Sequence, residues 1–321
     1  MNIRMLRTRT LKTRLRGTAA LALLPLLALT ACGSGGTGGA AAVGAEASPA
    51  PTDDPVATVR KVDSAAALLP AGVRKAGKLR VGSSVGFPPG AYYPNGTDKA
   101  PAGQDIDLAD AVAKVLGVGL ERQDASFEAI LPALGSGKYD VGASNFGVTD
   151  ERRRIIDFVT YINDGQGFAT RKDSKLSKVT DLKQLCGLNV ATGAGTTFEA
   201  TLEENKKLCT TAGKKPYTVQ TYSETGAIWS SLQQGRSDVV MSTINGLRYA
   251  VAQQQGVKFL NEYHRLDVGF AFKKGTKLAP AFQSAVNKLI ADGTYEKILK
   301  KWGTTGSAIT KSQISPPELK N

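Results

Sequence analysis

Arg152 is the residue whose type and setting most clearly indicate chemistry. It follows Thr149, Asp150 and Glu151, which are typical of a helix start because they cap free amides and suit the positive end of the dipole. A cation in that first turn opposes the dipole, and residues set against local preference collect at functional sites. A guanidinium beside exposed turn amides is a suitable receptor for a small carboxylate. The alternative is that Arg152 belongs to a solvated basic face over residues 152–154.

Two similar segments are candidates to position such a site. Residues 129–141 match residues 227–239 without a gap, with identities at Ala129/Ala227, Ile130/Ile228, Leu134/Leu232, Gly137/Gly235, Asp140/Asp238 and Val141/Val239. Each copy reads as an amphipathic helix, a terminating glycine and a strand. The repeat therefore predicts two α/β lobes built alike. The alternative is a chance similarity of one helix and its turn.

Hydrophobic patterning predicts the remaining elements. Residues 138–143 read as a buried strand, followed by a polar, glycine-containing break at 144–147. The capping-box spacing of Thr196 and Glu199 starts a helix that reaches to about residue 208. Further elements are expected as strands at 78–83, 188–191 and 238–241, extended crossovers at 166–171 and 268–272, and helices at 105–116, 246–255 and 278–302, the last broken at Asp292-Gly293 and returned to the first lobe.

The first 32 residues read as an export signal. Residues 1–18 carry six basic residues and no acid, and the apolar stretch 19–29 has 11 residues, too few to span a bilayer. The following Leu29-Thr-Ala-Cys32 resembles the bacterial lipobox, in which the cysteine is lipidated and becomes the first residue. We therefore expect a lipoprotein signal peptide at 1–31, and lipidated Cys32 with a flexible tether over 32–57. The alternative is an ordinary cleaved signal with an incidental cysteine.

Charge and cysteine usage restrict the function classes. The net charge is +13, and loss of the signal leaves 35 basic against 28 acidic residues. The basic residues are scattered and not interleaved with aromatics, so nucleic acid is not an expected partner. With Cys32 lipidated, Cys186 and Cys209 remain and are expected to form a disulfide in an oxidising compartment. A metal site lacks ligands, since His264 is the only histidine, and no metal or cofactor is expected.

Seven short motifs in order resemble one family over residues 78–303. They are Leu79-Arg-Val-Gly82, Gly103-Gln-Asp-Ile-Asp-Leu-Ala109, Leu131-Pro-Ala-Leu-Gly-Ser-Gly-Lys-Tyr-Asp140, Val148-Thr-Asp-Glu-Arg152, Gly195-Thr-Thr197, Gly235-Arg-Ser-Asp238 and Ala291-Asp-Gly-Thr-Tyr-Glu-Lys297. The chain resembles bacterial extracellular solute-binding proteins of the polar amino acid class, the receptors of ABC importers. The resemblance implies a two-lobed periplasmic-binding-protein-like α/β fold (type II), with two crossover segments and a ligand cleft between the lobes. We expect lobe 1 at 58–167 plus 268–305, lobe 2 at 168–267 and a C-terminal tail at 306–321.

The same resemblance implies a set of ligand contacts. Arg152 would hold the ligand carboxylate in a bidentate pair. Thr196 and Thr197 would donate backbone N–H groups and a hydroxyl from the other lobe. Phe87 and Phe127 match aromatic walls, although Phe127 shares a helical face with apolar residues and could equally be core. The loop before Arg152 would add backbone groups of Gly147 and the side chain of Asn145.

Three positions depart from the family pattern. Thr243 stands where an acid usually pairs the ligand's α-ammonium, with Asn245 close by as a second polar contact. Ser84 stands where binders of basic amino acids often carry an acid, and Gln104 replaces an aromatic. The ligand is therefore expected to be an amino acid or an amino-acid-like carboxylate. A substituted or quaternary amine held by aromatic faces and an acidic or neutral side chain both stay open.

The expected function is a non-catalytic receptor. It would be a lipid-anchored monomer at the extracellular face of the bacterial cell membrane and would deliver its ligand to an ABC permease. Hinge motion at 166–171 and 265–272 would close the lobes on the ligand. One alternative is an exported, dehydratase-like enzyme on the same fold, for which Glu128 is the only acid expected near the cleft. A third possibility is a ligand-sensing module, which normally continues into a transmembrane segment and a signalling domain.

Overall fold

The computed structural model describes residues 51–94, 96 and 100–320. These residues belong to the compact unit Val43–Asn321. The expected signal peptide, the lipidated Cys32 and the first part of the tether lie outside the described residues. Among the described residues, none of the helices combines the length and apolar character needed to cross a membrane.

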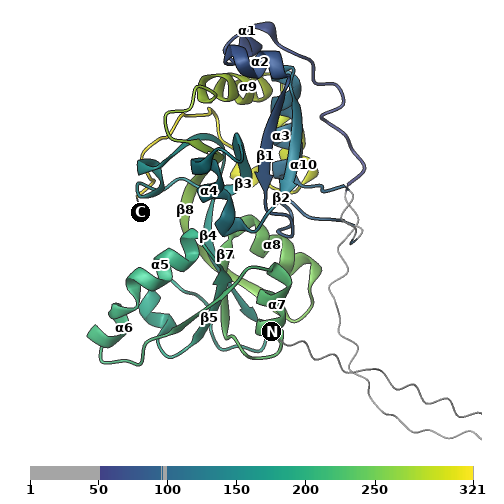
Figure 1. Cartoon of the computed structure of the whole chain (residues 1–321). Coiled ribbons are helices and arrows are strands. Elements are labelled where there is room, and N and C mark those ends of the chain that lie inside the picture. The colour runs from purple at the N-terminus through teal and green to yellow at the C-terminus, as the bar shows by residue number, and fades with distance from the viewer. Residues whose placement is uncertain (1–50, 95, 97–99, 321) are drawn as a thin grey trace, which may run out of the picture. The chain divides into compact units, whose positions relative to one another are not determined.

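One mixed sheet of eight strands organises the described chain (Figure 1). Its strand order is β2-β1-β3-β8-β4-β7-β5-β6. The strands are β1 (Lys78–Ser83), β2 (Gly119–Asp124), β3 (Val141–Gly147), β4 (Ile156–Arg171), β5 (Asn189–Gly193), β6 (Thr218–Tyr222), β7 (Val239–Thr243) and β8 (Val257–Lys273). Pairs β1–β2 and β5–β6 are parallel, and β4 runs antiparallel to β8 along almost its whole length. This topology places two parallel α/β halves on either side of one antiparallel pair.

Helices cover each half of the sheet (Figure 1). They are α1 (Asp63–Ala66), α2 (Ala71–Ala76), α3 (Gln104–Leu116), α4 (Phe127–Ser136), α5 (Thr197–Asn205), α6 (Lys207–Thr211), α7 (Thr225–Gln233), α8 (Ile244–Gln253), α9 (Ala279–Ala291) and α10 (Thr294–Lys301), with short 3-10 turns η1 (Arg152–Arg154), η2 (Leu182–Leu185) and η3 (Thr305–Ser307). The predicted break in the last helical stretch is confirmed, because Gly293 takes a left-handed φ of 79° between α9 and α10.

The two long strands are the crossovers between the lobes. Strand β3 pairs with β8 up to Val268, and β7 pairs with β4 from Gln166 onward. Between these pairings lies the segment 163–165, opposite 265–267. The crossovers were predicted at 166–171 and 268–272, which are extended as expected. Each is only one end of a strand of 16 or 17 residues, so the change of lobe lies at 163–165 rather than within 166–171.

Apolar side chains form separate cores in the two lobes. In the first lobe, Leu108 of α3 and Phe282 of α9 pack with Tyr161 and Phe270 of the crossover strands. In the second, Phe168 of β4 packs with residues of η2, β5 and α5. No buried cluster of the described residues contains core positions from both lobes. The predicted return of the last helices to the first lobe is confirmed, since they join its core.

The segment around Arg152 differs from the prediction. The strand expected at 138–143 is β3, Val141–Gly147, so the expected polar break is the end of a strand with an irregular register between Gly142 and Phe146. The helix expected after Thr149 is only the single turn η1. Its end is explained by the buried residues Ile156 and Phe158, which alternate with period two and extend the chain into β4. Thr149 still accepts a hydrogen bond from the Arg152 N–H at 3.1 Å.

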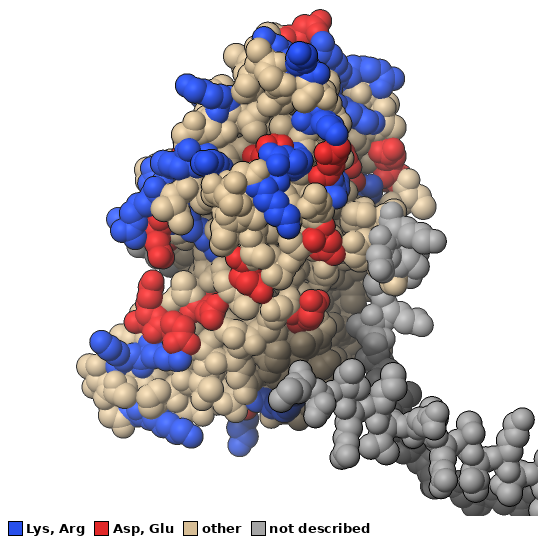
Figure 2. Space-filling view, viewed as in Figure 1, with Lys and Arg blue, Asp and Glu red and all other residues tan. Residues whose placement is uncertain are grey.

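Three further features concern the surface and the chain ends. Cys186 and Cys209 form the predicted disulfide, with a Cα–Cα distance of 5.5 Å. The described part of the C-terminal tail lies along β4, where the Ser312 hydroxyl donates to the Thr160 carbonyl at 2.6 Å. On the face that Figure 2 shows, acidic side chains lie among the lysines and arginines. That face therefore lacks a continuous basic surface of the kind that follows a nucleic acid backbone.

Candidate functional site

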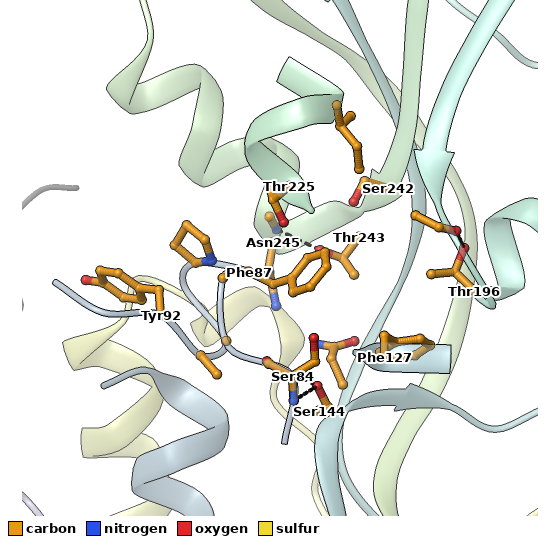
Figure 3. A pocket seen from close by; sticks show the side chains of 18 of the residues that line it. Ser84, Phe87, Tyr92, Phe127, Ser144, Thr196, Thr225, Ser242, Thr243 and Asn245 are labelled. Atoms are coloured by element: carbon orange, nitrogen blue, oxygen red, sulfur yellow. Dashed lines mark hydrogen bonds between the residues drawn. The ribbon is translucent and has the colours of Figure 1, made fainter. Parts of the chain in front are cut away.

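A cavity of about 370 Å³ lies between the two lobes. First-lobe residues of the 84–93 loop, α3, α4 and β3 form one wall, and second-lobe residues of α5, α7, β7 and α8 form the other. Figure 3 shows Phe87 and Phe127 directed into this space, together with polar side chains from both lobes. The structure brings together all ten residues that the sequence singled out as ligand contacts, namely Ser84, Phe87, Phe127, Asn145, Gly147, Arg152, Thr196, Thr197, Thr243 and Asn245.

Arg152 carries the positive charge of the cavity and joins its two walls. Its Nη1 donates to the Gly147 carbonyl at 3.1 Å and its Nη2 donates to the Gly195 carbonyl of the second lobe at 3.0 Å. Among the described residues, no carboxylate forms an ion pair with it. Burial lowers the pKa of Arg152 to about 10, so the guanidinium stays charged at neutral pH. A desolvated cation bound only to carbonyls retains donors for an anion.

The start of α5 faces the same end of the cavity. The Thr196 hydroxyl accepts from the Glu199 N–H at 3.3 Å and donates to the Gly193 carbonyl at 2.7 Å. The predicted cap at Thr196 is therefore confirmed. The Glu199 carboxylate accepts from the Gly195 N–H at 2.7 Å, one residue earlier than a capping box requires. The positive end of this nine-residue helix adds to the attraction that Arg152 exerts on an anion.

Aromatic side chains form much of the remaining lining. The Phe127 ring stacks on Phe146 with 4.8 Å between centroids and also lies 5.9 Å from the Arg152 guanidinium. Phe127 therefore packs on the core and also lines the cavity, and its role as a wall for the ligand stays a prediction. Further aromatic residues of the lining were not predicted from the sequence, among them Tyr222, Trp229 and Tyr249. Their helical or strand positions made them look like ordinary core residues.

Polar groups line the wall nearest the crossover strands. The Ser84 N–H donates to the Ser144 hydroxyl at 3.1 Å, drawn as a dashed line in Figure 3. The Thr243 hydroxyl accepts from the Gly246 N–H at 3.0 Å and caps α8. Asn245 accepts from the Ser307 hydroxyl at 3.1 Å, and its Nδ2 atom is buried without a partner in the described part of the chain. A buried donor left unbonded is costly, so this corner of the cavity wall is polar but incompletely bonded.

The acid that lines the cavity is not the one expected from the sequence. Glu128 was expected to be the only acid near the cleft, but Asp105 lines the cavity, whereas Glu128 accepts from the Ser223 hydroxyl of the other lobe at 3.2 Å. Burial raises the pKa of Asp105 to about 6, against the opposing effect of hydrogen bonds from Tyr161 and Gln104. Sequence reasoning missed Asp105 because an aspartate in the first turn of a helix is ordinary.

The two lobes touch across the cavity. Besides the bonds of Arg152 to Gly195 and of Ser223 to Glu128, a Cβ placed on Gly195 would lie 2.6 Å from the Cβ of Glu128. The backbone of Gly195 has a φ of 70°. Only glycine allows both this conformation and this approach without strain. The structure is therefore a closed arrangement of the lobes.

Comparisons with known proteins agree with this geometry. Residues 79–305 match the family model of bacterial extracellular solute-binding proteins, family 3. The arginine-binding protein ArgT of Corynebacterium glutamicum is 28% identical over 79% of this chain and 83% of its own. A solved ancestral arginine-binding protein bound to arginine is 33% identical over 70% of this chain and 98% of its own, with a TM-score of 0.63. The ancestral amino acid-binding protein AncCDT-1, a precursor of cyclohexadienyl dehydratase, is 29% identical over 72% of this chain and 97% of its own, also with a TM-score of 0.63.

Proposed function

The chain belongs to the bacterial extracellular solute-binding proteins of family 3, and from this premise we propose that it closes its lobes over an amino acid or an amino-acid-like carboxylate. The observation that carries the proposal is Arg152. Its charge lies between the lobes beside the start of α5, bonded to one carbonyl from each lobe and to no acid of the described residues. A ligand carboxylate at this point would complete the pairing of the guanidinium and hold the lobes together.

The rest of the cavity supports a ligand larger than a simple carboxylate. Phe87 and Phe127 offer aromatic faces, and the buried Nδ2 of Asn245 and Oγ1 of Thr225 lack partners within the described residues. Pockets of this kind fix orientation with a few polar groups and gain affinity from apolar contact. Relatives that carry amino acids in their names, as ArgT does, support the same ligand class.

The cellular role follows from the proposed ligand and the sequence signals. A lipid attached at Cys32 would hold the receptor at the extracellular face of the cell membrane. The closed form with bound ligand would then dock on the permease of an ABC importer. Docking would release the ligand to the permease. The receptor is proposed to act as a monomer and without a cofactor.

A second candidate is an exported enzyme of the dehydratase type. The observation that favours it is Asp105, a carboxyl in the cavity wall whose pKa is raised to about 6 and so suits general acid–base chemistry near neutral pH. One solved neighbour is described as a precursor of a dehydratase. The two candidates make opposite predictions about whether a bound compound changes.

A thermal-shift screen of the mature protein separates these possibilities. A compound that binds only the folded state stabilises it by about 2.7 kcal/mol at a hundred times its dissociation constant. We expect a common amino acid or related carboxylate to raise the midpoint for the wild type and for Arg154→Ala, but not for Arg152→Ala. Arg154 is an exposed neighbour of the same turn and serves as the matched control.

Mass analysis of the recovered compound completes the test. A receptor returns the compound unchanged after prolonged incubation, whereas an altered compound would establish the enzyme. A stabilising carboxylate that binds Arg152→Ala as well as the wild type would contradict the proposed role of the cavity.

A further inference from the structure

Asp164 is a buried carboxylate at the point where β4 passes from one lobe to the other. Its exposed fraction is 0%, and it lies within the segment 163–165 between the two lobe pairings of the crossover strands. Among the described residues, no cation forms an ion pair with it. Arg265, whose charge acts on Asp164, is paired with Glu262 at 2.9 Å and donates to the Asn163 carbonyl at 3.0 Å.

Asp164 is hydrogen-bonded to one residue from each wall of the cavity. Its Oδ2 accepts from Asn145 Nδ2 of the first lobe at 3.5 Å, and its Oδ1 accepts from the Asn245 N–H of the second lobe at 3.2 Å. Asn145 and Asn245 both line the cavity. The carboxylate therefore lies behind the lining, bonded to the side chain of Asn145 and to the backbone of Asn245.

The sheet places Asp164 close to Thr243, the position where the family pattern has an acid that this chain lacks. Gln166 pairs with Thr243 across β4 and β7, and Asp164 lies two residues earlier on the same strand. The start of α8 follows Thr243 at once, which brings the Asn245 N–H onto Asp164. Thr243 uses its hydroxyl as a helix cap and brings no charge. A negative charge is thus present beside this corner of the cavity, but on a different strand.

We propose that Asp164 supplies the negative charge that selects a ligand with a cationic nitrogen, acting through the side chain of Asn145 in place of an acid at Thr243. The inference rests on the proposed function and names the second half of its ligand. Arg152 takes the carboxylate, and the wall backed by Asp164 takes the ammonium or another cationic nitrogen. Asp164 is a positioning residue, since it orients the side chain of Asn145, anchors the backbone of Asn245 and adds charge behind them.

The charged and titratable groups around Asp164 determine how this selection depends on pH. The pKa of Asp164 is raised to about 7, chiefly by burial and also by the charge of Asp105, against the lowering effect of the two hydrogen bonds and of Arg265. On the facing strand β8, Asp267 accepts from Asn163 at 3.1 Å. From the first lobe, Tyr161 accepts from the Asn145 N–H at 3.1 Å.

A cationic ligand favours the ionised form of Asp164 and thereby lowers its pKa on binding. Binding below that pKa must therefore release a proton, and affinity falls as the pH falls, by up to about tenfold for each pH unit. Above about pH 8 the carboxylate is ionised before binding and the affinity becomes independent of its proton.

Calorimetric titration tests the proposal with L-arginine, L-glutamine and L-cystine as probes. Titrations of the wild type in two buffers of different ionisation enthalpy, between about pH 5.5 and pH 8.5, measure proton release directly. We expect release that approaches one proton near about pH 6 and vanishes near about pH 8.5. This measurement needs no variant, so it holds even if a substitution prevents folding.

Two substitutions assign the proton. Asp164→Asn keeps an acceptor for the Asn245 N–H but removes the charge, and is expected to abolish proton release and weaken binding about ten- to a hundredfold at high pH. Asp267→Asn is the matched control, because it removes a carboxylate of the facing strand that lies outside the cavity lining, and it should leave the release in place. Asp105→Asn tests whether the other buried carboxyl releases the proton instead. Adding Thr243→Asp to Asp164→Asn should restore affinity, because it places an acid at the vacant position.

The outcomes separate this inference from the proposed function. If Arg152→Ala abolishes binding while Asp164→Asn leaves affinity and proton release unchanged, the inference about Asp164 is overturned and the receptor stands. Loss of proton release in Asp105→Asn instead would assign the charge to Asp105 and equally overturn it. If no amino acid binds the wild type, the proposed function and the inference both fall.

Discussion

The Nη2 atom of Arg152 donates a hydrogen bond to the Gly195 carbonyl across the cavity, at 3.0 Å. This contact joins a turn of the first lobe to the loop that starts α5 in the second. It places the guanidinium where closure of the lobes and recognition of an anion depend on the same residue. Changes on either side of the contact should therefore alter ligand affinity more than they alter folding.

Gly195→Ala should weaken binding by obstructing closure. The new Cβ would lie 2.6 Å from the Cβ of Glu128, which belongs to the other lobe, and the φ of 70° adds local strain. Gly187→Ala is the matched control, since it has a φ of 84° and open space around the new Cβ. Both should lower the free energy of unfolding by about 1 kcal/mol. Calorimetry should show weaker binding of the best amino acid only for Gly195→Ala, and equal affinities in the two variants would contradict the close approach.

The two aromatic walls should respond differently to truncation. Phe127 stacks on Phe146 and packs against the buried cluster around Ile130, so Phe127→Ala should reduce both stability, by about 2–4 kcal/mol, and ligand affinity. Phe87 lies in the cavity loop and belongs to no buried cluster of the described residues. Phe87→Ala should therefore reduce affinity with little change in the denaturation midpoint. An unchanged affinity in Phe87→Ala would remove it from the proposed site.

Unfolding of the ligand-free protein should become more difficult as the pH falls from about 8 to about 5. The pKa values of Asp105 and Asp164 are raised to about 6 and about 7 by burial, above the 3.8 of an exposed aspartate. The folded state therefore binds protons more strongly than the unfolded state, and stability is gained as these carboxyls protonate and lost as the pH rises through their folded pKa values.

The size of this effect is on the order of 1.4 kcal/mol for each unit of pKa shift. Urea denaturation at several pH values measures it, and the double variant Asp105→Asn/Asp164→Asn should flatten the profile. Below about pH 4 the opposite trend sets in, because Asp140, whose pKa is lowered by Arg80, loses its bonded charge. Stability that rises steadily from about pH 5 to pH 8 would contradict the burial of both carboxyls.

The disulfide should stabilise the second lobe without affecting the cavity. Cys186 and Cys209 are 23 residues apart, and closing a loop of this length contributes about 3 kcal/mol through the unfolded chain. Both cysteines pack in the core that lies under η2 and α6, away from the lining of the cavity. The variant Cys186→Ser/Cys209→Ser should therefore lose stability in urea and keep its ligand affinity. Two free thiols in the exported wild type would refute the pairing.

Local pattern was enough to predict much of this fold. The strand Lys78–Ser83 and the paired helix–glycine–strand units were predicted because each depends on neighbours in sequence. The prediction of a helix after Thr149 was wrong. The residues that such a helix would need belong to the long strand β4. The full length of the crossovers also escaped prediction, since pairing of β4 with β8 joins residues about a hundred positions apart.

The same contrast between local and long-range signals applies to the residues of the site. Arg152 was found because a cation conflicts with the start of a helix, which is a local signal. Asp105 agrees with its local setting and gave no signal. The surroundings of Asp164 could not be predicted, because they depend on the register that brings Asn145 and Asn245 onto one carboxylate. Sequence reasoning thus singled out the residue with an unusual local setting, Arg152, and missed the carboxyls whose unusual setting is assembled by the fold.

The most direct test of the central claim is the affinity of the best-binding amino acid for four proteins, measured by calorimetry at neutral pH. These are the wild type, Arg152→Lys, Arg152→Ala and Arg154→Ala. We expect Arg154→Ala to match the wild type, Arg152→Lys to bind about tenfold or more weakly because an ammonium cannot form the paired hydrogen bonds, and Arg152→Ala to show no measurable binding. Wild-type affinity in Arg152→Ala would show that the cavity does not bind its ligand through this carboxylate receptor.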